Sequence, residues 1–88
     1  MKILLLGVRS EHLNLIRLKY PSIKFKAVTD QKKIRPRDIN LGFDFIISNY
    51  KFTNHSTENY CKSHTGYMRA SSYTHIQQLI GDIISCQT

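Results

Sequence analysis

Short apolar strand patterns alternate with helix patterns four times along this chain, and this alternation limits its fold more than any other feature. The strand patterns cover residues 2–7, 23–28, 43–47 and 67–70, and each precedes a segment with helical spacing or a helix cap. Strands and helices in this order predict parallel strands joined by right-handed crossovers. The sequence therefore predicts a three-layer α/β fold built on a four-stranded parallel sheet.

The apolar density of each run predicts its place in the sheet. Residues 2–7 and 43–47 are apolar at nearly every position, which is typical of strands buried on both faces. Residues 23–28 alternate instead, and Lys24 and Lys26 give the run one wet, charged face that is typical of an edge strand. These assignments predict the strand order 2-1-3-4, with a switch point between the first and third strands.

A helix is expected after each strand, at residues 10–20, 35–42 and 55–62 and in a final segment near the C-terminus. The final helix has the clearest apolar stripe, which consists of Ile76, Leu79, Ile80 and Ile83. The residues expected to cap the helices are Ser10, Thr53 or Asn54, and Ser71 or Ser72.

The length of 88 residues suits one small α/β domain spanning 1–88, without a second domain. Two cysteines, Cys61 and Cys86, are too few for a disulfide framework, so a reducing, cytoplasmic location is expected. The first apolar run is shorter than a signal-peptide core or a membrane span, so no membrane partner is expected. A four-stranded sheet leaves two edges, and pairing of two copies into a homodimer is a further expectation.

A ligand site is expected at the carboxyl ends of the strands, because open α/β sheets bind ligands there near the switch point. The candidate ligand-binding residues at this edge are Gly7, Arg9, Ser10, Asn54, His55 and Ser72. Helix starts offer free N–H groups to a phosphate or carboxylate, and Arg9 adds a fork of donors. The alternative is that the serine and asparagine side chains are ordinary helix caps.

The cluster that most resembles metal or nucleophile chemistry consists of His55, Cys61 and His64. Zinc would need two further ligands, and Cys61 is expected to be structural. Of the dinucleotide-binding fingerprint only Gly7 is present, and the Walker A spacing is absent. The sequence predicts no metal, no cofactor and no catalytic residue, while a small hydrolase or transferase with His55 as general base stays an alternative.

Thirteen Lys and Arg against six Asp and Glu give a net charge of +7, which favours anionic partners. The candidate nucleic-acid-binding residues are Lys32, Lys33, Arg35 and Arg37, with Tyr50 and Phe52 as candidates for stacking on a base. The alternatives are a solvated charged surface and aromatic packing against the core. No helix-turn-helix, zinc finger or aromatic ribonucleoprotein motif accompanies these residues.

Four short motifs have a recognisable order along the chain. They are Gly7-Val8-Arg9, Asp44 before Phe45-Ile46-Ile47, Thr53-Asn54-His55, and Ser71-Ser72 ahead of Ile76. This set resembles a family of small bacterial Rossmann-like domains of unknown function. The resemblance implies a Rossmann-like fold over nearly the whole chain and a polar site shared by Arg9 and His55, and it implies no reaction.

Three function hypotheses follow. The first is a non-enzymatic regulatory or inhibitory binding protein, of the kind that a phage or mobile element encodes, which recognises an anionic ligand or host protein at the strand-end edge. The second is a nucleic-acid-binding protein that uses the Lys and Arg surface. The third is the small hydrolase or transferase described above.

Overall fold

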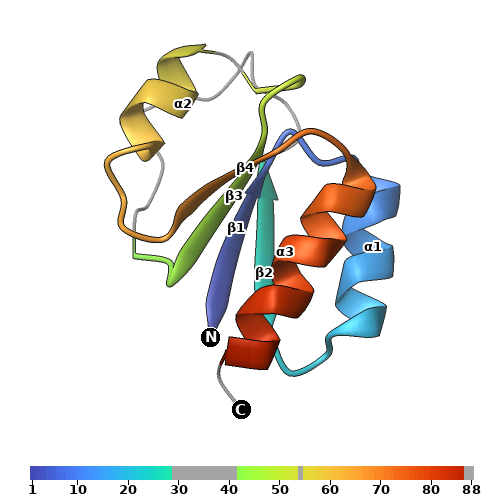
Figure 1. The fold of residues 1–88 in the computed structure, drawn as a ribbon. Coiled ribbons are helices and arrows are strands. Elements are labelled where there is room, and N and C mark those ends of the chain that lie inside the picture. The colour runs from blue at the N-terminus through green and yellow to red at the C-terminus, as the bar shows by residue number, and fades with distance from the viewer. Residues whose placement is uncertain (29–41, 54, 87–88) are drawn as a thin grey trace.

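The protein forms a four-stranded, all-parallel sheet with helices on both faces (Figure 1). The structure is a computed structural model that describes residues 1–28, 42–53 and 55–86. The strands are β1 (Lys2–Leu6), β2 (Lys24–Val28), β3 (Phe45–Asn49) and β4 (Tyr67–Ala70), and the helices are α1 (Ser10–Lys19), α2 (His55–Cys61) and α3 (Tyr73–Cys86). The strand order β2-β1-β3-β4 confirms the predicted order and the α/β class.

The central strands bury both of their faces, because successive side chains of a strand point to opposite sides. On one side, Ile3 and Leu5 of β1 belong to a core shared with α1 and α3. On the other side, Leu4 and Leu6 belong to a smaller core with Cys61 of α2. Figure 1 shows the same arrangement, with α1 and α3 together on one face and α2 on the other. The predicted three layers are therefore present.

The helices of the larger core are anchored unequally. Helix α3 buries Ile76, Ile80 and Ile83, whereas α1 buries only Ile16. Full burial of one such side chain contributes roughly 1.5–3 kcal/mol, so α3 is held to the sheet far more strongly than α1.

The predicted bounds of two elements are wrong. Strand β3 runs from Phe45 to Asn49, two residues further along the chain than expected, because hydrogen-bonded neighbours on both sides extend its polar end: Ser48 pairs with Leu6 and Asn49 pairs with Ala70. The N-cap of α1 is Arg9, which has an extended backbone and no side-chain cap, and Ser10 is already helical. Because β3 ends at Asn49, this polar side chain lies at the edge of the sheet where ligands bind.

The final helix begins as predicted. The backbone N–H of His75 donates to Ser72 Oγ at 3.1 Å, which makes Ser72 the cap of α3. The expected helix at residues 35–42 and the basic residues Lys32, Lys33, Arg35 and Arg37 lie outside the described residues. No helix within the described ranges is long and apolar enough to cross a membrane. The single domain and the homodimer stay predictions.

Gly7 allows the β1–α1 turn to lie directly against the β3–α2 turn. Its φ of +72° is a conformation that favours glycine. A Cβ at this position would lie 2.9 Å from Thr53 Oγ1, 3.0 Å from the carbonyl oxygen of Asn49 and 3.1 Å from the carbonyl carbon of Phe52. No other residue type fits here without moving one of the two turns.

We expect Gly7→Ala to lower the free energy of unfolding by about 1–3 kcal/mol, because alanine would have to adopt a positive φ and press on backbone atoms. Gly81→Ala is the matched control, since Gly81 lies within α3 with no atom near its missing Cβ. This control should stabilise the protein by about 0.5–1 kcal/mol. Urea denaturation measures both. Equal effects of the two substitutions would show that the turns are not in close contact.

Candidate functional site

A pocket of about 580 Å³ lies at the carboxyl ends of β1, β3 and β4. This volume falls within the range of about 300–1,000 Å³ that is typical of small-molecule sites. Three turns that follow strands meet there. The residues that line the pocket are Gly7, Val8, Arg9, His12, Asn49, Lys51, Phe52, Ser71, Ser72, Tyr73 and Ile76. The pocket is thus at the switch point where the sheet topology predicts a ligand site.

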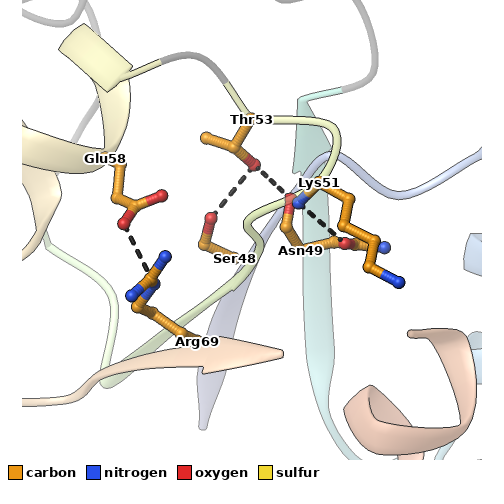
Figure 2. Close-up of polar contacts among 6 residues, drawn as sticks. All are labelled: Ser48, Asn49, Lys51, Thr53, Glu58 and Arg69. Carbon is orange, nitrogen blue, oxygen red and sulfur yellow. Dashed lines mark hydrogen bonds and ion pairs between the residues drawn. The ribbon is translucent and has the colours of Figure 1, made fainter. Parts of the chain in front are cut away.

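The turn after β3 is held by buried hydrogen bonds around Asn49 (Figure 2). Thr53 Oγ1 accepts from the Ser48 hydroxyl at 3.0 Å and donates to the carbonyl oxygen of Asn49 at 2.9 Å. The same carbonyl accepts the backbone N–H of Phe52 at 3.0 Å. These bonds fix the turn, and with it the positions from which Lys51 and Phe52 extend.

The first turns of α1 and α3 form the opposite side of the pocket. The rings of His12 and Tyr73 stack with centroids 4.0 Å apart and an interplanar angle of 18°. Ser72 caps α3, and the backbone N–H of Ser71 donates to Nδ1 of His75 at 3.2 Å. Arg9 begins α1 without using its side chain as a cap, so its guanidinium extends from an exposed position.

The described lining of the pocket carries positive charge. Arg9 and Lys51 are both exposed, and neither has an ion-pair partner within residues 1–28, 42–53 and 55–86. The lining residues named above include no carboxylate and no thiol. Arg69 makes no contribution there, since its Nε lies 3.0 Å from Glu58 Oε1 and Figure 2 shows this pair across β3 from Lys51. The pocket can therefore hold an anion with donors from three turns.

Three of the candidate residues from the sequence line the pocket: Gly7, Arg9 and Ser72. Ser10 and His55 do not line it. The crossover from β3 to β4 places α2 on the face opposite α1 and α3, so His55 begins a helix on the far side of the sheet. The candidate Asn54 lies outside the described residues.

Sequence reasoning missed other contributors to the pocket, namely His12, Lys51 and Tyr73. Lys51 lies two residues beyond the end of β3. It was missed as a candidate because the sequence predicts that this strand ends at residue 47. His12 lies in the first turn of α1 and Tyr73 in the first turn of α3. Both helices begin at the strand ends, so both rings reach the pocket. Helical spacing alone does not reveal which rings meet.

The sequence cluster of His55, Cys61 and His64 forms no reactive centre in the described structure. Cys61, the last residue of α2, is fully buried, and this burial raises the pKa of its thiol and favours the protonated form. His64 Nδ1 accepts the backbone N–H of Gly66 at 2.9 Å and serves the turn before β4. No group of three His, Cys, Asp or Glu side chains among the described residues is placed to hold a metal ion.

Comparison of the chain with protein-family models, curated proteins and solved structures finds no match. The resemblance to small bacterial Rossmann-like domains therefore stays a prediction. The pocket geometry supplies the arguments for function that follow.

We expect iodoacetamide to alkylate Cys86 in the folded protein and to spare Cys61 until urea unfolds the chain. Cys86 is exposed at the end of α3, whereas Cys61 is buried and protonated. Peptide mass mapping over time measures both sites, and Cys86 is the internal control. Similar alkylation rates in the folded protein would contradict a structural role for Cys61.

Proposed function

We propose that the protein is a non-enzymatic binding protein that recognises an anionic ligand in the strand-end pocket. The observation that carries this proposal is the presence of two exposed cations, Arg9 and Lys51, on a pocket whose described lining has no carboxylate. An anion there would gain charge-assisted hydrogen bonds without losing existing ion pairs.

The backbone adds to the same attraction. The first turns of α1 and α3 begin at this edge, and their dipoles favour negative charge. Helix α1 has no side-chain cap, so its first N–H groups stay available to a ligand. Helices α1 and α3 both contribute side chains to the pocket. The dipoles of the two helices therefore add to the positive charge of Arg9 there.

A binding role is favoured over catalysis by the chemistry of the lining. Nucleophilic catalysis requires an activated nucleophile with a positioned base. Nδ1 of His75 lies 3.4 Å from the Ser71 hydroxyl oxygen, and it already accepts the backbone N–H of Ser71. His55, the general base of the alternative hydrolase or transferase, does not line the pocket. The proposal extends to a regulatory or inhibitory role in the cytoplasm, of the kind that phages and mobile elements encode.

We expect Arg9→Ala and Lys51→Ala each to weaken binding of inorganic phosphate about tenfold, because each removes a charged donor from the anion. An NMR titration at constant ionic strength, with chloride as the competing anion, measures the affinity. The melting temperature should barely change, since both side chains are exposed.

Lys62→Ala is the control, because it removes one positive charge from an exposed residue outside the pocket. Phosphate affinity should survive this change. Equal losses in all three variants would indicate attraction by the net charge alone and would reject the pocket as the binding site.

Nucleic-acid binding is the second candidate, and an exposed row of lysines favours it. Lys2 pairs with Lys24 in the sheet register and Leu4 pairs with Lys26, so the three lysines lie on one face of the sheet. All three are exposed. Such a row at the β2 edge could follow the phosphates of a nucleic-acid strand.

We expect a nucleic-acid complex to weaken steeply with salt, and the double substitution Lys24→Ala/Lys26→Ala to reduce the slope of log affinity against log salt by about 2. Gel mobility-shift assays over a salt series with a single-stranded oligonucleotide measure this slope. The double substitution Lys32→Ala/Lys33→Ala tests the basic group outside the described residues in the same way, through the slope of log affinity against log salt. A complex with no salt dependence, or no complex at low salt, would reject this candidate.

A further inference from the structure

Phe52 holds an exposed aromatic ring at the pocket. Its side chain is 67% exposed, the largest exposed fraction of any Phe or Tyr ring in the described structure. The exposure does not come from a loose loop, because the backbone N–H of Phe52 donates to Asn49 and the next residue, Thr53, is buried. An uncovered ring at the pocket, on a backbone that is held by a hydrogen bond, is suited to stacking on a flat ligand.

Asn49 provides a buried donor that faces the same pocket. Its side chain is only 6% exposed. The backbone N–H of Lys51 donates to Asn49 Oδ1 at 3.2 Å, which fixes the amide nitrogen at the other position. Asn49 is one of the residues that line the pocket. Its amide nitrogen is therefore a donor from which an oxygen atom of a bound ligand can accept.

The charge of the pocket matches a phosphate group better than a single carboxylate. A phosphate monoester carries a charge of about −1.5 to −2 at neutral pH and presents three acceptor oxygens. Arg9 and Lys51 supply two positive charges on the same pocket. A carboxylate would leave one of these cations without a counterpart.

We infer that the ligand is a nucleotide, with its phosphate held by Arg9 and Lys51, its base stacked on Phe52, and one of its oxygens accepting from the Asn49 amide. The inference rests on the proposed function, since it names the class of anion that the same pocket takes. An inorganic anion alone would leave Phe52 uncovered, and the Asp and Glu side chains that make a peptide acidic have no flat ring to stack on it. A nucleotide uses all of these features together.

Titrations with three probes test this inference: adenosine 5′-monophosphate, ribose 5-phosphate and adenosine. Stacking of one base contributes enough to raise affinity about tenfold or more, so the monophosphate should bind at least that much more tightly than ribose 5-phosphate. It should also bind more tightly than adenosine, which lacks the charge. Isothermal titration calorimetry with the full chain measures the three affinities.

Variants at Phe52 separate the base from the phosphate. Phe52→Ala should reduce monophosphate affinity to that of ribose 5-phosphate and leave ribose 5-phosphate itself unaffected, while Phe52→Tyr should retain the difference. Leu18→Ala is the matched control, because Leu18 is an exposed apolar side chain on α1 that does not line the pocket. Its affinities should equal those of the unmodified protein.

The possible results are separable. Equal affinities for the monophosphate and ribose 5-phosphate would overturn the nucleotide inference and leave the anion site intact. Failure of every phosphate probe to bind would overturn the proposed function as well. A 5′-phosphorylated trinucleotide identifies the source of the nucleotide: tighter binding than the monophosphate supports the end of a nucleic-acid strand, and weaker binding supports a free nucleotide.

Discussion

The contact between the β1–α1 turn and the β3–α2 turn is the constraint on which the site depends. It exists because Gly7 has no side chain and adopts a positive φ, which allows its backbone to touch Asn49 and Thr53. If the turns were further apart, Arg9 and Lys51 would not line one pocket. The bonds from Ser48 through Thr53 to the Asn49 carbonyl hold one partner of this contact rigid. Close backbone packing and buried hydrogen bonds thus both fix the positions of these two turns at the switch point.

Much of the architecture could be predicted from the sequence because apolar density differs between strands. The dense run at Leu4–Leu6 marks a central strand, and the alternation around Lys24 and Lys26 marks an edge strand; these two facts with the crossover rule give the strand order. The strand-end rule then places Gly7, Arg9 and Ser72 correctly at one edge.

The rest could not be predicted, because it depends on three-dimensional contacts. Strand β3 extends through Ser48 and Asn49 because neighbouring strands bond to it on both sides, although these residues look like a loop in the sequence. Arg9 begins α1 in place of the expected serine, and no local pattern marks it. The placement of His55 away from the pocket follows from the direction of the β3–β4 crossover. That crossover puts α2 on the far face of the sheet.

The stacking of His12 on Tyr73 joins two helices that differ in how firmly the core holds them. Helix α3 is anchored by three buried isoleucines, whereas α1 has a single buried side chain in Ile16. Local unfolding of α1 would separate the two rings and dismantle one wall of the pocket at the same time. Occupancy of the pocket and docking of α1 are therefore thermodynamically linked, so a molecule that contacts both helix starts would stabilise the state in which α1 is packed on the sheet.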